Sequence, residues 1–210
     1  MLRPWWRWRT RRLLDRARAQ QAAGLTGSGQ AATLRAALAA ANRCGAASPE
    51  LARALDALVA LAARDERLCS APELDAWIER RVALGADDLA RASILSGHAL
   101  TFRAARQPSR AEPLARRALG LLDASLPADD PRLEQALDTV AGIALRLGHH
   151  AEAEEALGRL LTLEERRAEG LELAATLNRL AQVKRALGKN VEASDLDERV
   201  AELRERRGLR

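Results

Sequence analysis

The side chains best suited to chemistry in this 210-residue chain are three histidines, two cysteines and several adjacent carboxylates. A zinc site needs four ligands at spacings that one fold can bring together. Cys44 and Cys69 do not have such spacing to His98 or to the pair His149-His150, and no nucleophile, base and orienting residue can be grouped. The sequence therefore indicates a non-enzymatic protein, with no catalytic residues, no metal and no cofactors.

The remaining candidates for chemistry fit this interpretation. Carboxylate pairs such as Asp129-Asp130, Glu154-Glu155 and Glu164-Glu165 occur where charged runs are ordinarily solvated helix faces or turns. The glycines of residues 24–29 lack the spacing and the lysine of a phosphate-binding loop. We therefore expect the chain to act by binding. The N-terminal residues and the repeated helices are the elements expected to present the binding residues.

The N-terminal residues are the most unusual stretch. Seven arginines and one aspartate lie within residues 1–18, a charge of 7 − 1 = +6, whereas the whole chain carries +5. Three of the four tryptophans alternate with these arginines. The residues expected to make contacts from this tail are Trp5, Trp6, Arg7, Trp8, Arg9, Arg11 and Arg12.

Four roles are compatible with this tail. It suits docking onto an acidic partner protein, and it suits an anionic membrane surface, where Trp occupies the interface and each Arg contributes about 1 kcal/mol. Contact with phosphates and stacking on single-stranded nucleic acid is a less favoured alternative. A solvated terminus without a role is the fourth.

From Asp87 to Arg206 the chain repeats itself. Leu95, Leu137 and Leu177 recur at spacings of 42 and 40 residues, and alanines follow at constant offsets. The alanine columns are Ala99, Ala141 and Ala181, and then Ala111, Ala153 and Ala193. A weaker fourth copy contains Leu55, Val59 and Ala71. A fixed period of this length indicates stacked repeats that bury their apolar faces against one another.

Each copy has the pattern of two helices. Apolar residues from Leu133 to Leu147 follow helical spacing, Gly148 interrupts them, and a second apolar face runs from Ala153 to Leu163. Aromatic residues make up only 2% of the chain, and helix formers dominate. The sequence predicts an all-α protein in which small alanines allow helices to approach closely.

These features resemble the tetratricopeptide repeat (TPR) family: a small residue within the first helix, a glycine turn, and alanine at the close contact of the second. The period exceeds the usual ~34 residues, and residues 111–119 and 126–131 resemble the kinesin-light-chain variant. Phe102 stands where the family's Tyr is common. The resemblance implies a right-handed α–α superhelix (solenoid) of about four helix pairs, preceded by the basic Trp-rich tail.

The resemblance also implies an adaptor or scaffold for protein–protein interaction, which holds a peptide or helix on the concave face lined by the first helices. Carried over by position, the groove residues are Ser96, Arg103, Asp138, Leu145, Arg146, Asn178, Gln182 and Arg185. The arginines among them favour an acidic partner, and the tail supplies a second attachment point. Membership of a larger complex fits such a module.

The expected organisation has four parts. A tail covers residues 1–23, a Gly/Ser linker 24–30, a capping helix 31–45, and the repeats 46–210, with copies at 50–85, 87–125, 131–166 and 171–206. Only two lysines, Lys184 and Lys189, accompany the many arginines, a bias typical of GC-rich bacteria. With no apolar run long enough to span a bilayer, the expected location is cytoplasmic, with peripheral attachment at the inner membrane face as an alternative.

Overall fold

The computed structural model describes residues 3–25, 27–167 and 170–206. This part of the chain is all-α, as the sequence predicts, and it contains no strand. The α-helices are α1 (Arg3–Ala22), α2 (Ser28–Asn42), α3 (Pro49–Arg64), α4 (Ala71–Val82), α5 (Asp88–Ala104), α6 (Pro108–Ser125), α7 (Arg132–Leu147), α8 (His150–Arg167), α9 (Gly170–Ala186) and α10 (Asn190–Arg206). A short 3-10 helix, η1 (Glu66–Leu68), follows α3.

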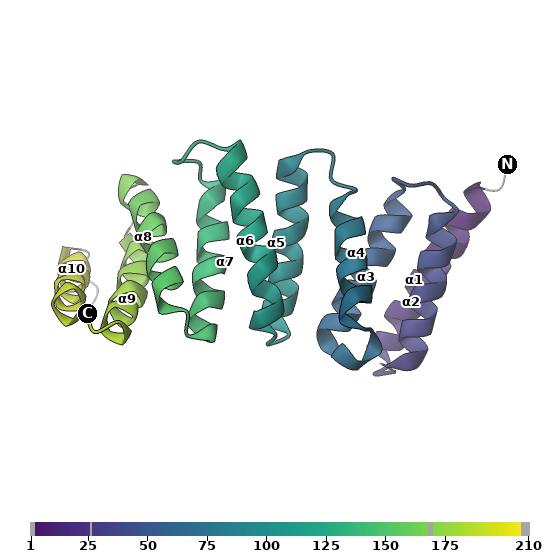
Figure 1. The fold of residues 1–210 in the computed structure, drawn as a ribbon, viewed down its shortest axis with the longest axis horizontal. Helices are drawn as coiled ribbons and strands as arrows, with labels where there is room; N and C mark the ends of the chain where they lie inside the picture. Colours follow the sequence, from purple (N-terminus) through teal and green to yellow (C-terminus); the bar gives the residue numbers. More distant parts are fainter. Residues whose placement is uncertain (1–2, 26, 168–169, 207–210) are drawn as a thin grey trace. The chain divides into compact units, whose positions relative to one another are not determined.

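The chain, whose helices are labelled in Figure 1, forms two compact units. Unit 1 is Met1–Gln107 and contains α1 to α5; unit 2 is Pro108–Arg210 and contains α6 to α10. In unit 1, α3 contacts α1, α2, α4 and α5, and α1 also packs along α2. In unit 2, each helix packs against the next one in the chain. Short connections and nearest-neighbour contacts are the packing expected of a repeat array.

The repeated leucines and alanines form the core. Leu95, Leu137 and Leu177 are at most 1% exposed. All six alanines of the two columns are fully buried, because a methyl group at a helix crossing lets two backbones approach. In the weaker copy Leu55 and Val59 are also fully buried, but Ala71 is exposed because it is the first residue of α4.

Local sequence sets the helix ends. Ser48 accepts a hydrogen bond from the Leu51 amide at 3.2 Å, and Ser70 and Asp87 cap α4 and α5 in the same way. The helix α7 ends at Leu147 and is followed by Gly148, whose φ of 75° is left-handed. The polar caps and the glycine satisfy backbone groups that a helix end leaves without partners.

The N-terminal segment differs from its sequence interpretation. Residues 3–22 form a helix, α1, that buries Thr10, Leu14 and Ala17 in unit 1. The expected linker is shortened to a turn around Gly24 and Gly27, since α2 begins at Ser28. The expected capping helix corresponds to α2. It is not the first helix of the array, because α1 precedes it and packs along it.

Candidate partner-binding sites

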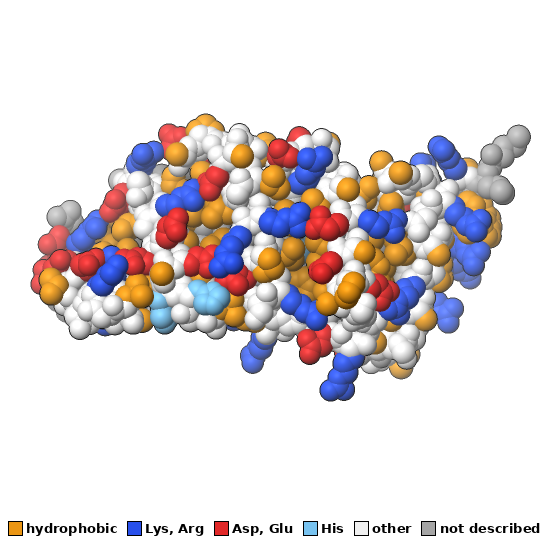
Figure 2. Space-filling view, viewed as in Figure 1, with side chains coloured by type: hydrophobic (Ala, Val, Ile, Leu, Met, Phe, Trp, Pro, Cys, Tyr) orange, Lys and Arg blue, Asp and Glu red, His pale blue; other side chains and the backbone are white. Residues whose placement is uncertain are grey.

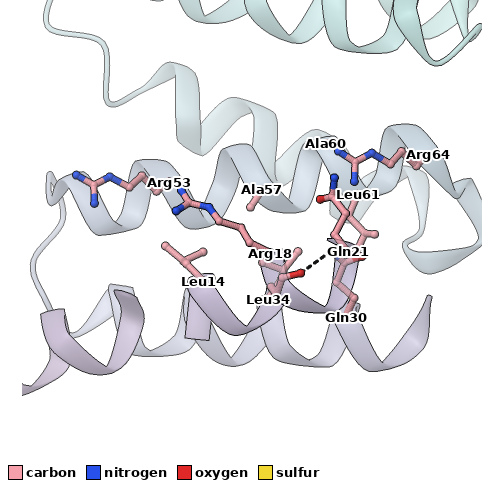
Figure 3. Close-up of a pocket in the computed structure, with 11 residues that line it drawn as sticks. Leu14, Arg18, Gln21, Gln30, Leu34, Arg53, Ala57, Ala60, Leu61 and Arg64 are labelled. Atoms are coloured by element: carbon pink, nitrogen blue, oxygen red, sulfur yellow. Dashed lines mark hydrogen bonds between the residues drawn. The ribbon is translucent and has the colours of Figure 1, made fainter. Parts of the chain in front are cut away.

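One pocket of about 160 Å³ lies in unit 1 between α1, α2 and α3. Figure 3 shows Arg18 extending from α1 toward α3, which contributes a row of residues on the opposite side. We call it the basic pocket. It is lined by Leu14, Ala17, Arg18, Gln21, Gln30, Leu34, Arg53, Ala57, Ala60, Leu61 and Arg64.

The charge of the basic pocket is positive and largely uncompensated. Arg53 and Arg64 make no ion pair with any residue of the described ranges, and Arg18 pairs only with Asp15 of its own helix, at 3.4 Å. No acidic residue is among the lining residues. Three guanidinium groups around an apolar floor favour an anionic ligand, because guanidinium forms paired hydrogen bonds with carboxylates.

A buried amide adds a second feature to this pocket. Gln30 is only 3% exposed; its Nε2 donates to the Ala17 carbonyl at 3.0 Å, and its Oε1 has no partner. A buried acceptor without a donor costs about 1–3 kcal/mol. A ligand that brings an N–H group to Gln30 would remove this cost.

The basic pocket depends on how α1 is held. Arg11 donates to Glu50 Oε1 from Nε at 3.2 Å and from Nη2 at 3.0 Å, and Arg7 approaches the other oxygen at 4.0 Å. The Arg43 guanidinium lies 4.6 Å from the centre of the Trp6 ring. These contacts fix α1 to α2 and α3, so that Arg18 stands opposite Arg53.

A second surface of α1 consists of exposed side chains that lie outside the contacts of α1 with α2 and α3. We call the residues Trp5, Trp8, Arg9 and Arg12 the Trp/Arg face. Trp5 and Trp8 are 46% and 53% exposed, and the guanidinium carbons of Arg9 and Arg12 each lie 5.2 Å from a tryptophan ring centre. The seven expected tail residues thus divide: these four form the Trp/Arg face, while Trp6 contacts Arg43, and Arg7 and Arg11 contact Glu50.

Unit 2 contains a pocket of the opposite charge, of about 360 Å³, between α7, α8 and α9. We call it the acidic pocket. Asp138 pairs with Arg179 across it at 2.5 Å. It is lined by Glu134, Gln135, Asp138, Leu160, Glu164, Glu172, Ala175, Thr176 and Arg179.

Both pockets have the same construction. Each lies between the first helices of two successive helix pairs, and the second helix of the earlier pair, α2 or α8, forms part of the lining. Each lining also contains a buried side chain with an unpartnered oxygen, Gln30 in one and Glu164 in the other. The position of the two pockets follows from the repeat, whereas the charge of their lining residues is positive in unit 1 and negative in unit 2.

Three solved structures have a fold similar to that of this chain. The putative kinesin light chain of Podosopora anserina, with nearly identical TPR-like repeats, has 20% identity over 94% of this chain and 96% of its own, at a TM-score of 0.63; a singly substituted form of that protein gives 0.61. BtubC (BKLC) from P. vanneervenii has 18% identity over 91% of this chain and 78% of its own, at a TM-score of 0.57. The chain has a TPR-like fold of the kinesin-light-chain kind. No family model and no curated protein matches it.

Within this TPR-like fold, the groove residues expected from the sequence occupy varied settings. Asp138 lines the acidic pocket, and Asn178 donates to the Ala174 carbonyl of its own helix at 2.8 Å. Arg185 pairs with Asp197 of α10. Gln182 and Arg146 are exposed, and Ser96, Arg103 and Leu145 are half-buried. One of the two N–H donors of the Asn178 amide is therefore used within α9.

Sequence reasoning missed the basic pocket because it did not recognise the first copy of the repeat. The TPR-like period extends one copy earlier than expected: Leu14 lies 41 residues before Leu55, and Ala31 lies 40 before Ala71. Arg18 occupies the place, 41 residues before Val59, where the later copies have valine or alanine. That substitution hid the copy in the sequence and supplies a cation to the basic pocket.

Charged residues of unit 2 also bind one another across repeats, and Figure 2 shows acidic and basic side chains next to each other over this unit. Arg116 pairs with Glu152 at 2.5 Å, and Lys189 pairs with Glu154 at 2.8 Å. Arg199 pairs with Glu165 at 2.5 Å. Several carboxylates expected to be solvated are thus partners between neighbouring helix pairs.

One group of side chains has the composition of a metal site. The ligand atoms of Glu112, His149 and Glu152 lie within 4.8 Å of one another. His149 Nδ1 is 2.6 Å from Glu112 Oε1, and Arg116 pairs with both carboxylates. The Arg116 guanidinium therefore pairs with the carboxylate oxygens of Glu112 and Glu152 that a metal ion would need as ligands. The sequence did not indicate this group, since Glu112 precedes His149 by 37 residues.

Proposed function

We propose that this chain is a non-catalytic protein-interaction module, an adaptor or scaffold that holds an acidic segment of a partner protein in the basic pocket. The observation that carries the proposal is the pair Arg53 and Arg64, two cations without ion-pair partners among the described residues, beside a buried and unsatisfied Gln30 oxygen. A peptide supplies both complements, a carboxylate and a backbone N–H.

The TPR-like fold supports this proposal. The basic pocket lies between the first helices of successive pairs, which is where the family resemblance implies that peptides lie. Its volume suits part of a segment rather than a whole domain. Affinity would come from the arginines and from apolar contact with Leu14, Ala57 and Ala60.

The test compares binding of two fluorescein-labelled peptides to the full chain by fluorescence anisotropy. One peptide is Gly-Leu-Asp-Glu-Leu-Gly, and the other replaces its two acids by Asn and Gln. We expect the acidic peptide to bind at least tenfold more tightly than the amide peptide. Arg53→Gln with Arg64→Gln should abolish this preference.

The control removes the same charge elsewhere in unit 1. Arg67 and Arg106 are exposed and lie outside the basic pocket. Arg67→Gln with Arg106→Gln should change the affinity for the acidic peptide less than twofold. Equal losses in the two double variants would show that general charge, not the basic pocket, attracts the peptide, and would overturn the proposal.

The arginines expected from the sequence give a separate test. If the groove in unit 2 holds an acidic partner, Arg146→Ala with Arg185→Ala weakens binding of the same acidic peptide. Unchanged affinity would remove Arg146 and Arg185 from the proposed site and leave the basic pocket as the location.

A second candidate function rests on the exposure of Trp5 and Trp8 beside Arg9 and Arg12. This composition suits attachment to anionic lipid from the cytoplasmic side, and it suits single-stranded nucleic acid less, because the pairs of rings and guanidiniums already stack on each other. Within the described ranges, no helix is long and apolar enough to cross a bilayer.

Sedimentation with phosphatidylcholine vesicles, either pure or containing about 30% phosphatidylglycerol to supply the anionic surface, tests this candidate. We expect binding only to the anionic vesicles, a decrease with salt, and loss in Trp5→Ser with Trp8→Ser. Binding that persists in this variant would contradict a role for the Trp/Arg face.

A further inference from the structure

The acidic pocket of unit 2 is separate from the site of the proposed function and has the opposite charge. Four carboxylates line it, those of Glu134, Asp138, Glu164 and Glu172, against one cation, Arg179. The lining charge is therefore 1 − 4 = −3 when all groups are ionised. Asp138 and Arg179 compensate each other at 2.5 Å, and Glu164 and Glu172 add further negative charge to the lining.

One of these glutamates is buried and incompletely bonded. Glu164 is 9% exposed; its Oε1 accepts from Thr176 Oγ1 at 3.1 Å, and its Oε2 has no partner. Burial raises the pKa of Glu164, and the neighbouring carboxylates of Glu134 and Glu172 raise it further. A carboxylate so placed gains from a cationic donor, because the donor replaces the water lost on burial.

The arrangement of the acids favours an organic cation over a metal ion. Among the described residues, ligand atoms converge within 4.8 Å only at Glu112, His149 and Glu152, and not in the acidic pocket. Carboxylates spread along a pocket match a guanidinium, which presents five N–H donors in a plane. Leu160 and Ala175 supply apolar contact for the methylene groups of such a side chain.

We infer that the acidic pocket binds the side chain of an arginine in a partner protein, with Glu164 Oε2 as an acceptor and Glu172 at the exposed rim. The inference rests on the proposed function in one respect, that the ligand belongs to a partner protein. A partner with an acidic segment and a separate arginine could then engage each unit by its own pocket.

The experiment titrates the full ¹⁵N-labelled chain with N-acetyl-arginine amide and follows amide chemical shifts. N-acetyl-citrulline amide is the matched neutral probe, since it has the same shape without the charge. We expect saturable shifts at Gln135, Ala175 and Thr176 with the arginine compound, and at least fivefold weaker binding of the citrulline compound.

Two variants locate the binding. Glu164→Gln keeps the size of the side chain and should weaken arginine-amide binding at least fivefold. Glu198→Gln removes the same charge from an exposed position on α10 and should change it less than twofold. Glu172→Gln, at an exposed rim position, should give an intermediate loss and does not disturb a buried group.

The inference is overturned if citrulline amide binds as tightly as arginine amide, or if Glu164→Gln and Glu198→Gln behave alike. It is also overturned if the saturable shifts fall outside α7, α8 and α9. These outcomes are independent of the acidic-peptide assay, which reports on Arg53 and Arg64 in unit 1. Failure of one proposal is therefore distinguishable from failure of the other.

Discussion

Arg11 and Glu50 join the first helix of the chain to the third. Two nitrogen atoms of the Arg11 guanidinium donate to one oxygen of Glu50, whose side chain is 2% exposed, whereas that of Arg11 is 60% exposed. Burial by itself raises the pKa of Glu50, but its own backbone amide and the Arg11 and Arg7 guanidiniums outweigh burial, and the net pKa is lowered. The contact fixes α1, and with it one wall of the basic pocket.

Glu50→Gln should lower the free energy of unfolding of the chain by about 1–3 kcal/mol at pH 7, because it replaces a charged acceptor by a neutral one. Urea denaturation followed by circular dichroism measures the change. Asp75→Asn is the control, since Asp75 is exposed on α4. A loss of the same size in the control would show that general charge balance, not the contact with Arg11, is responsible.

The same pair predicts a pH dependence. A carboxyl group whose pKa is lowered in the folded state stabilises the fold above its ordinary value, here 4.5, and loses this contribution as the pH falls through the lowered pKa. The stability difference between the native chain and Glu50→Gln should therefore be full at pH 7 and shrink at pH values below 4.5. A difference that stays constant to pH 3, well below that value on the ordinary scale, would contradict the lowered pKa of Glu50.

Glu164 should behave in the opposite way. Because burial raises its pKa in the folded state, the folded chain binds this proton more tightly, and stability falls as the pH rises from the ordinary value toward the raised one. Glu164→Gln should remove this fall and leave the chain at least as stable as the native one at pH 7. Denaturation midpoints at pH 4.5 and pH 7 check it, and marked destabilisation of Glu164→Gln at pH 7 would contradict the prediction.

The fold was predictable because burial in this chain is periodic. Leucine and alanine at fixed offsets mark buried positions of the helices α5 to α10, and Phe102 is fully buried at the position the TPR resemblance gave it. The helix α1 was not predictable by the same reasoning, since Arg18 stands where the later copies have valine or alanine. Its arginines also masked its amphipathic character, because only Thr10, Leu14 and Ala17 are buried.

The pockets were less predictable than the fold. Their residues come from three helices each, and the sequence gives no spacing between Gln30 and Arg53 or between Glu164 and Asp138 that signals proximity. Glu164 resembles the exposed Glu165 in sequence, yet one is buried and the other pairs with Arg199. Which side of a helix is covered depends on the neighbouring pair, and that information lies in the packing.

The alanine columns predict that replacing a buried alanine by a larger residue destabilises the chain much more than the same replacement at an exposed alanine. Ala141 on α7 is fully buried at a helix contact, so Ala141→Leu should destabilise the chain by about 1–3 kcal/mol through overpacking. Ala151 is exposed on α8, and Ala151→Leu should stay within about 0.5 kcal/mol of the native chain. Thermal unfolding compares them, and equal midpoints would contradict close packing at Ala141.

Gly148 and Gly158 both have space for a side chain, since a methyl group added at either position meets no atom within 4 Å. They differ in backbone conformation: Gly148 has a φ of 75° at the end of α7, and Gly158 lies inside α8. Gly148→Ala should cost about 1–2 kcal/mol, the penalty for an L-residue in the left-handed region. Gly158→Ala should instead stabilise the chain by about 0.5–1 kcal/mol, because alanine loses less backbone entropy in a helix. Urea denaturation of both variants measures the two changes, and a shift of the same sign in both would show that the left-handed turn after α7 does not limit which residue can occupy it.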